Sequence, residues 1–231
     1  MVINGLQKLT LLDFPGRTAC TVFTGGCNFR CPFCHNASLV LRAEEQPFMP
    51  EEDFFAFLKK RQGLLDGVCI TGGEPTLRPD LPDFMRKIKY LGYSVKLDTN
   101  GYRPEILKKI ISEGLADYVA MDIKSSPSRY GIVAGIPDLD IGPIRQSVSE
   151  LMECRVPFEF RTTVVDELHE PEDFEEIGRW LKGAPQYFVQ CFKDSGDIIS
   201  DGFSAPGRWK LDKIVEILDR YVFSVQLRGV D

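Results

Sequence analysis

The stretch CNFRCPFC at residues 27–34 places three cysteines in a C-x3-C-x2-C pattern, directly after Gly25 and Gly26. Thiolates packed so closely favour a soft metal centre, because thiolate is the ligand that iron-sulfur clusters and zinc prefer. A cubane cluster held by three cysteines leaves one iron without a protein ligand, and an open position is how a metal site binds a substrate. The pattern therefore predicts a catalytic 4Fe-4S cluster held by Cys27, Cys31 and Cys34.

Two other uses of these cysteines remain open from spacing alone. A structural zinc ion would need a fourth ligand, for which His35 or Cys20 lies nearest, but zinc sites usually have a second, separate ligand pair and none follows here. Disulfides are disfavoured because the chain has seven cysteines, is not small, and does not begin with a signal-peptide pattern. We therefore expect a protein of the reducing cytoplasm.

The motif C-x3-C-x-aromatic-C resembles the signature of radical S-adenosylmethionine (radical SAM) enzymes. The flanking text, LTLLDFPG at residues 9–16 and Cys34-His35-Asn36, is most similar to the activating proteins of anaerobic ribonucleoside-triphosphate reductases. These belong to the glycyl radical enzyme activating family, of which pyruvate formate-lyase activating enzyme is a close relative. The resemblance runs through most of the chain and is strongest from about residue 5 to residue 125.

Composition agrees with a single catalytic domain spanning residues 1–231. The 231 residues are 43% hydrophobic, which is enough for one sizeable core. No apolar run reaches the ~18 residues that a membrane-spanning helix needs, so we expect no membrane association. The formal charge of -6 argues against a protein that grips a phosphate backbone, and no nucleic-acid partner is expected.

Short β-rich runs alternate with longer amphipathic stretches, the pattern of βα units around a parallel sheet. About six such units are too few for a closed eight-stranded barrel, so we predict an α/β fold in the form of an incomplete, open barrel, which the resemblance also implies. The cluster loop is expected at residues 24–36. The predicted strands are 18–23, 68–71, 94–98, 118–123, 158–164 and 187–190, and the predicted helices are 50–61, 81–91, 104–113, 144–154, 171–181 and 210–221.

Functional groups of parallel sheets gather at the carboxyl ends of the strands. The second predicted strand ends in Gly72, Gly73 and Glu74, where adjacent glycines let the backbone approach a ligand and the carboxylate adds negative charge. Alone this is most often an ordinary turn. Following a cysteine loop by some 40 residues, it resembles the family segment that holds the methionine amino group of S-adenosylmethionine.

Two further strands end in charged residues. The pair Asp98 and Thr99 reads locally as a turn or helix cap, and Asp122 with Lys124 reads as an edge ion pair. The family places such residues around the cofactor. By that resemblance Lys124 meets the methionine carboxylate or a ribose hydroxyl, whereas Asp98 and Asp122 bind ribose or hold a monovalent cation beside that carboxylate.

The fifth predicted strand puts Arg161 on the same alternating face as Glu159 and Thr163. An inward arginine needs an anionic partner, and Arg161 matches a family arginine that binds a carboxylate. The alternative is a surface arginine paired with Glu159 or Asp166. At the end of the sixth strand, Gln190 stands where the formate-lyase type tends to have a histidine near adenosine, and we take Gln190 as its replacement.

Two residues of the cluster loop complete the expected site. Phe33 either fills the loop against the barrel or, as in the family, lies beside adenine. His35 either hydrogen-bonds the cluster sulfur or is an ordinary loop residue. The remaining cysteines, in or beside predicted elements, are expected to be small buried hydrophobes: Cys20, Cys69, Cys154 and Cys191.

The resemblance implies a radical SAM oxidoreductase that forms a 5′-deoxyadenosyl radical and removes hydrogen from a glycine of a partner enzyme, most plausibly anaerobic ribonucleoside-triphosphate reductase. It also implies a one-electron donor such as flavodoxin or ferredoxin. The alternatives are an activase of a formate-lyase-type enzyme and a radical SAM enzyme acting on a small metabolite or another macromolecule. The segment 194–208, near Phe203 and Trp209, is expected to be either a mobile partner-facing loop or an irregular connection.

Overall fold

The computed structural model describes residues 1–230, which form one eight-stranded sheet with the strands in sequence order. The first strand pairs antiparallel with the second, and every later neighbour is parallel. The strands are β1 (Gly5–Thr10), β2 (Ala19–Thr24), β3 (Gly67–Gly72), β4 (Ser94–Thr99), β5 (Tyr118–Asp122), β6 (Phe158–Val164), β7 (Tyr187–Cys191) and β8 (Val225–Arg228).

Each pair of parallel strands is joined by a helical connection. The helices are α1 (Ala37–Leu41), α2 (Glu51–Lys60), α3 (Leu81–Tyr90), α4 (Pro104–Ser112), α5 (Tyr130–Val133), α6 (Gly142–Glu153), α7 (Asp173–Trp180) and α8 (Arg208–Leu218), with short 3-10 turns η1 (Ala43–Glu45) and η2 (Pro75–Leu77). Helix α2 shows why they form where they do, because acids in its first turn and lysines in its last turn match the helix dipole.

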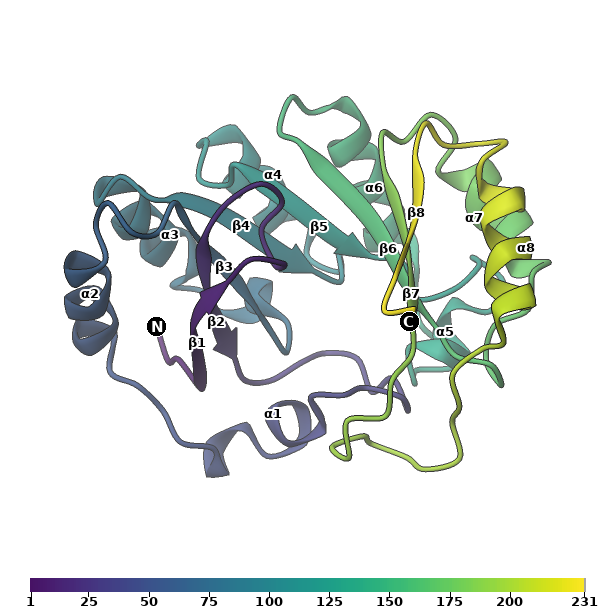
Figure 1. The fold of residues 1–231 in the computed structure, drawn as a ribbon, viewed down its shortest axis with the longest axis horizontal. Helices are drawn as coiled ribbons and strands as arrows, with labels where there is room; N and C mark the ends of the chain where they lie inside the picture. Colours follow the sequence, from purple (N-terminus) through teal and green to yellow (C-terminus); the bar gives the residue numbers. More distant parts are fainter. Residues whose placement is uncertain (231) are drawn as a thin grey trace.

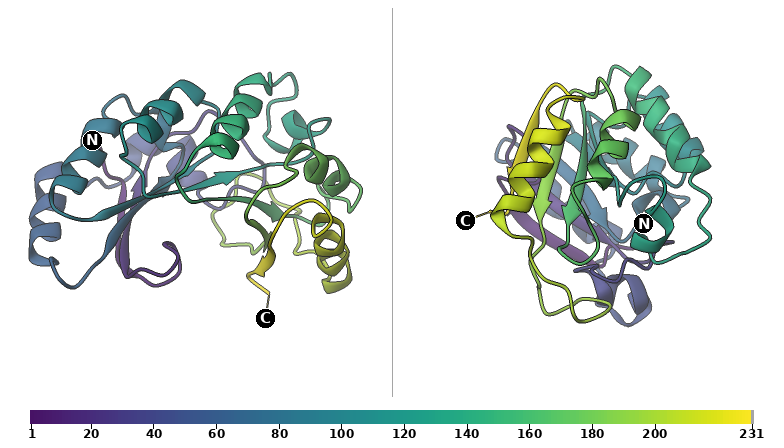
Figure 2. Two further views of the ribbon diagram at one scale, coloured as in Figure 1. Left: turned by 90° about the horizontal axis from the view of Figure 1, so that it is seen from above. Right: turned by 90° about the vertical axis from the view of Figure 1, so that its right-hand side faces the viewer.

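The sheet curves into an open arc with most helices along its outer side, while α1 and the segment after β7 lie below the open side (Figure 1). Figure 2 shows the same one-sided arrangement from two further directions. Within residues 1–230, β1 pairs only with β2 and β8 only with β7, so the barrel does not close. The prediction of an open α/β barrel is therefore confirmed.

The six helical connections between β2 and β8 correspond to the six predicted βα units. All six predicted strands are present within one or two residues, and so are five of the six longer helices, whereas α8 ends at Leu218, three residues before its predicted end. The prediction missed β1, β8 and the short helices α1 and α5. β1 has an exposed middle and β8 has only four residues, so neither shows the long buried run that identified the others.

A buried ion pair between Glu159 on β6 and Arg228 on β8 holds β8 to the sheet. Glu159 is fully buried, and its carboxylate accepts hydrogen bonds from Tyr118 Oη at 2.8 Å and from Arg228 Nη1 at 2.9 Å. The Arg228 guanidinium also lies 3.2 Å from the centroid of the Phe188 ring. The alternative of a surface Arg161 paired with Glu159 or Asp166 is wrong, because the Arg161 side chain is only 15% exposed and pairs with Asp98 and Asp122.

We predict that Arg228→Met destabilises the protein by about 3 kcal/mol, because it leaves the Glu159 carboxylate buried without its cation. Urea unfolding of the two proteins measures this. Arg220→Met is the matched control, since Arg220 is more than half exposed and pairs with Glu175 at the surface, where an ion pair contributes at most about 1 kcal/mol. Equal losses in the two variants would contradict the assignment.

Candidate active site

A cavity of about 550 Å³ lies at the carboxyl ends of the parallel strands. It is formed by residues in the carboxyl-terminal halves of the strands, such as Arg161 in β6, and by the loops that follow β2, β3, β4, β5 and β7, as expected for a parallel sheet. Every site residue expected from the sequence lines this cavity: Cys27, Cys31, Phe33, Cys34, His35, Gly72, Gly73, Glu74, Asp98, Thr99, Asp122, Lys124, Arg161 and Gln190.

The cysteine loop is held to three other parts of the chain by backbone hydrogen bonds. Gly26 N donates to Leu39 O at 2.8 Å, Glu74 N donates to Gly26 O at 2.8 Å, and Arg30 N donates to Ala134 O at 2.9 Å. The Cys27 sulfur accepts from Phe29 N at 3.3 Å and lies 3.8 Å from Asn100 Nδ2. Contacts within the protein therefore set the position of the loop, and one thiol has two donors nearby.

The three thiols are enclosed enough for burial to dominate their acidity. Burial raises the pKa of Cys27 to about 11 and that of Cys31 to about 12, and the thiols raise one another's pKa further while the Lys124 ammonium opposes the shift. A metal that binds here must displace their protons. Lys124 is therefore close enough to stabilise the thiolates that result.

The arrangement of the thiols fits a cubane better than a single ion. In the described part of the chain, no three metal-binding side chains converge on one point, as a mononuclear zinc site requires. A cubane spreads its three cysteines over three different irons, so thiols that line one side of a cavity fit it. The geometry thus gives the zinc alternative no support.

The turn after β3 approaches the cysteine loop so closely that it needs glycine. A Cβ atom on Gly73 would lie 2.0 Å from Gly26 O, and Gly72 has φ +112°, which L side chains rarely adopt. Asn36 Nδ2 donates to Gly72 O at 3.2 Å. Adjacent glycines therefore let the β3 turn and the cysteine loop form one wall of the cavity.

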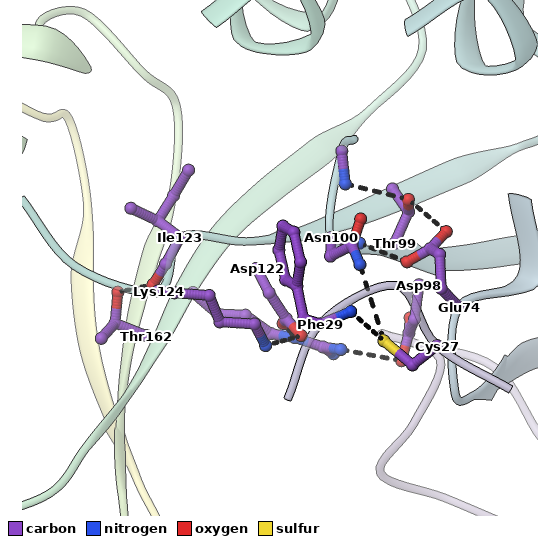
Figure 3. Close-up of polar contacts among 12 residues, drawn as sticks. Cys27, Phe29, Glu74, Asp98, Thr99, Asn100, Asp122, Ile123, Lys124 and Thr162 are labelled. Atoms are coloured by element: carbon purple, nitrogen blue, oxygen red, sulfur yellow. Dashed lines mark hydrogen bonds and ion pairs between the residues drawn. The ribbon is translucent and has the colours of Figure 1, made fainter. Parts of the chain in front are cut away.

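Glu74 has a structural use that the sequence did not reveal. Its buried carboxylate accepts from Thr76 N at 3.0 Å, from Thr99 Oγ1 at 2.8 Å and from Asn100 N at 2.7 Å, and it also accepts from Thr76 Oγ1. Burial raises its pKa although these four donors act in the opposite direction. Glu74 thereby ties the turns after β3 and β4 together, and Asn100 extends the connection to Cys27 (Figure 3).

Charged side chains from three neighbouring strands form the floor of the cavity. Arg161 Nη2 donates to Asp98 Oδ2 at 3.1 Å, and Arg161 Nε donates to Asp122 Oδ1. Lys124 Nζ donates to Asp122 Oδ2 at 2.9 Å. Arg161 points inward and has anionic partners, as expected, but in this structure they are protein carboxylates rather than a ligand.

Phe33 packs edge-on against His169 and Phe192, with ring centroids 6.3 and 6.5 Å away. His169 is a site residue that the sequence analysis missed. Its ring is fully buried, its Nδ1 accepts from Val165 N at 3.1 Å, and its Nε2 lies 2.8 Å from Lys124 O. The neutral ring with a proton on Nε2 satisfies both contacts, and it fixes the backbone of Lys124 relative to Phe33.

The segment after β7 lies against the cysteine loop and α1. Ser38 donates from N and Oγ to the Asp197 carboxylate, and Ser200 N donates to Pro32 O at 2.9 Å. Phe203 is half-buried and Trp209 is exposed. The segment thus covers one side of the cavity, as an irregular connection that is anchored at several points.

The other expected positions are as follows. His35 is exposed at the rim of the cavity, and Ser195 Oγ donates to its carbonyl at 3.4 Å. Cys20 and Cys69 are fully buried, in agreement with the prediction, whereas Cys154 and Cys191 are only partly buried. No helix within residues 1–230 is long and apolar enough to span a bilayer.

The family model that describes the radical SAM superfamily matches residues 21–181, which include the cysteine loop and the turns after β3, β4 and β5. The chain therefore belongs to the radical SAM superfamily. Membership implies a 4Fe-4S cluster and S-adenosylmethionine, and the cavity described above holds the donor set that such a cluster needs.

A protein of Methanocaldococcus jannaschii carries the name of a glycyl-radical enzyme activating enzyme, given to it by inference. It is 31% identical to this chain over the whole of this chain and 97% of its own length. The pyruvate formate-lyase-activating enzyme of Clostridium pasteurianum is 33% identical over 53% of this chain and 52% of its own. The crystal structure of Streptococcus suis SuiB bound to S-adenosylmethionine shares the fold, with a TM-score of 0.65 and 17% identity over 89% of this chain. This chain spans 49% of the SuiB chain.

We predict that Gly73→Ala nearly abolishes cleavage of S-adenosylmethionine. The new Cβ would meet the backbone of Gly26, so the cysteine loop must shift, and a displacement on the order of 1 Å at a reacting centre costs roughly 100-fold in rate. Methionine formation under anaerobic reducing conditions measures the effect. Gly63→Ala is the control, since a Cβ there meets nothing within 4 Å and the substitution, at φ +77°, strains the backbone only at a place away from the cavity. Unchanged turnover in Gly73→Ala would contradict the proposed wall of the cavity.

We also predict a pH-dependent contribution of His169 to stability. Burial lowers the pKa of His169 below its ordinary value, although the contact of Nε2 with Lys124 O opposes the shift. The unfolded chain therefore binds a proton at this histidine before the folded chain does, so the contribution is present above about pH 6.5 and is lost as the pH falls. Melting temperatures between neutral and mildly acidic pH should fall more steeply for the wild type than for His169→Gln. Parallel profiles would contradict this.

Proposed function

We propose that this protein is an activase of a glycyl radical enzyme. The observation that carries the proposal is that the cysteine triplet, the Gly-Gly-Glu turn and the charged residues on or directly after β4, β5 and β6 line one cavity. The name of the M. jannaschii relative, which matches this chain from end to end, supports the same activity. The match to the pyruvate formate-lyase-activating enzyme adds support over half of the chain.

In this proposal Cys27, Cys31 and Cys34 hold the cluster, and the remaining lining residues hold S-adenosylmethionine. The cluster, when bound, supplies the electron that splits S-adenosylmethionine and so yields a 5′-deoxyadenosyl radical that removes hydrogen from its target. Glu74 already has four donors, so the backbone of Gly72 and Gly73 is the better candidate for the methionine ammonium. Phe33, held by His169 and Phe192, is placed to contact adenine.

The charged floor is suited to a ligand carboxylate. Lys124 is only 19% exposed, faces the cysteines and shares Asp122 with Arg161. A ligand carboxylate that approaches Lys124 would therefore enter a site whose cation is already oriented, so little reorganisation accompanies binding. The enclosed cavity also excludes water from a reactive carbon radical. Gln190 also lines the cavity, and we assign it a hydrogen bond to the nucleoside.

The partner we propose is anaerobic ribonucleoside-triphosphate reductase, with a flavodoxin or ferredoxin as electron donor and a site in the cytoplasm. The likeness of residues 9–16 and 34–36 to the reductase activases supports this choice over a formate-lyase. Ser195 in the segment 194–208 lines the cavity, and Trp209, which follows the segment in α8, is exposed, so we assign this region to contact with the partner.

The cluster assignment predicts that Cys31→Ala abolishes the reducible cubane signal after anaerobic reconstitution with iron and sulfide, together with all methionine formation. Electron paramagnetic resonance and iron analysis measure the first, and product chromatography measures the second. Cys154→Ala is the matched control, because Cys154 lies outside the cavity and its sulfur donates only to Val156 O among the described contacts. Stoichiometric zinc in a colourless protein would contradict the cluster.

The partner is tested by mixing the reduced protein with S-adenosylmethionine and each candidate enzyme. A doublet radical signal that appears on the reductase, and is lost with Cys31→Ala, is the expected result. A signal only on a formate-lyase would move the proposal to that partner. Methionine formation with no signal on any glycyl radical enzyme of the host would favour a small metabolite or another macromolecule as the substrate.

A further inference from the structure

Lys96 on β4 is a buried cation that the proposed function does not use. Its side chain is 1% exposed, and it does not line the cavity. The Lys96 ammonium donates a hydrogen bond to the Asp98 carboxylate from outside the cavity, and it lies 3.9 Å from the sulfur of Cys69. Lysine is almost never fully buried unless it is paired, so the role of Lys96 is to be sought in Asp98.

Lys96 begins a row of alternating charges that crosses three strands. Asp98 Oδ1 accepts from Lys96 and Asp98 Oδ2 accepts from Arg161 at 3.1 Å. Asp122 Oδ1 then accepts from Arg161, and Asp122 Oδ2 accepts from Lys124 at 2.9 Å. Figure 3 shows Asp122 and Lys124 to the left of Cys27, with Asp98 next to Cys27 in this view. All four carboxylate oxygens of the row therefore have a cationic side chain as partner.

The charges remain at neutral pH. Burial alone would lower the pKa of Lys96, but the Asp98 carboxylate outweighs it and raises that pKa above the ordinary value. Burial opposes ionisation of Asp98 too, yet Arg161 and Lys96 lower its pKa. Three cations and two carboxylates thus give the row a net charge of +1.

This balance does not fit a bound monovalent cation. A Na⁺ or K⁺ ion at Asp98 or Asp122 would have to share an oxygen with a fixed cationic partner, and it would raise the local charge to +2 in a partly buried site. A ligand carboxylate, in contrast, would neutralise the row. The cation that the sequence resemblance implies therefore finds no carboxylate oxygen here that is free of a cationic partner.

We infer that the ammonium of Lys96 takes the place of a monovalent cation at Asp98, so that S-adenosylmethionine binds to this protein without Na⁺ or K⁺. The inference rests on the proposed function only in taking S-adenosylmethionine as the ligand. Lys96 is a positioning residue, because it touches Asp98 and not the cavity. Asp98 in turn holds Arg161, which shares Asp122 with Lys124.

Lys96→Met tests this role. Methionine keeps the apolar stem and removes the ammonium, so Asp98 loses one of its two cations and a space beside it becomes available to an ion. We expect the variant to bind S-adenosylmethionine about tenfold more weakly than the wild type in tetramethylammonium chloride, whose cation is too large to enter. Ammonium or K⁺ at the same ionic strength should restore most of the affinity.

Equilibrium dialysis of reconstituted protein with labelled S-adenosylmethionine measures these affinities. The wild type should bind equally, within about a factor of two, in sodium, potassium and tetramethylammonium chloride. Lys108→Met is the matched control, since Lys108 is exposed and pairs with Glu150 at the surface. It should behave as the wild type in every salt.

Thallium-205 resonance provides a readout without S-adenosylmethionine, because Tl⁺ occupies K⁺ sites. No bound signal is expected from the wild type, and one is expected from Lys96→Met. A wild type that needs Na⁺ or K⁺, or that binds Tl⁺, would overturn the inference. So would a variant that binds S-adenosylmethionine normally in tetramethylammonium, or that no cation restores.

The wild-type salt series and thallium spectrum decide the question even if Lys96→Met does not fold. A wild type that binds no S-adenosylmethionine in any salt would refute the proposed function, whereas the thallium spectrum would still report on the cation. Failure of the function and failure of the inference are thus distinguishable.

Discussion

The buried carboxylate of Glu74 is the contact on which the geometry of the site depends. It accepts four hydrogen bonds from two turns that are separate in sequence, and its own backbone N–H bonds to the cysteine loop through Gly26. A carboxylate in so enclosed a place is tolerated only when its oxygens are satisfied. Glu74 therefore fixes the turns after β3 and β4 to each other, and the cysteine loop to both.

Parallel pairing of the strands brings the turns that Glu74 connects to the same edge of the sheet. Because β2 to β8 run in the same direction, the residues that follow them meet at one edge of the sheet, although they are spread from Cys27 to Gln190 in sequence. Short backbone contacts then fix the position of these loops relative to one another. The close approach of Gly73 to Gly26 O, which leaves no room for a Cβ, is one such contact. The contact of His169 with Lys124 O is another. The strands fix where each loop begins, and the functional side chains lie in these loops or near the ends of the strands.

Much of this was predictable from the sequence, and the remainder has a physical explanation. Strands with long buried runs were found within one or two residues, whereas β1 and β8, at the edges of the sheet, lack a buried run long enough to be recognised. The lining residues were found because they sit in short motifs directly after strands. Lys96 and His169 were missed because their roles come from partners that only the folded chain brings together, such as Lys124 O, 45 positions away from His169 in sequence.

The same distinction applies to Arg161. Alternation along β6 showed that its side chain points inward and needs an anion, but not which one. Its partners depend on how β6 is aligned with β5, where Asp122 is directly opposite Arg161, and on the reach of the guanidinium past β5 to Asp98. Inter-strand alignment is a property of the assembled sheet, so no local pattern predicted the pairing.

That alignment gives the buried charges a second consequence, for folding itself. A sheet whose inward and outward residues alternate resists a slip of one residue, because every side chain would change face, but a slip of two residues preserves the alternation. If β6 moved by two positions against β5, Arg161 would stand opposite Ala120, and Asp122 would lose its guanidinium inside the barrel. Misaligned forms of the sheet are thus penalised by stranded charge where hydrophobicity alone would accept them. The ionic row selects one strand alignment among several that are equally apolar.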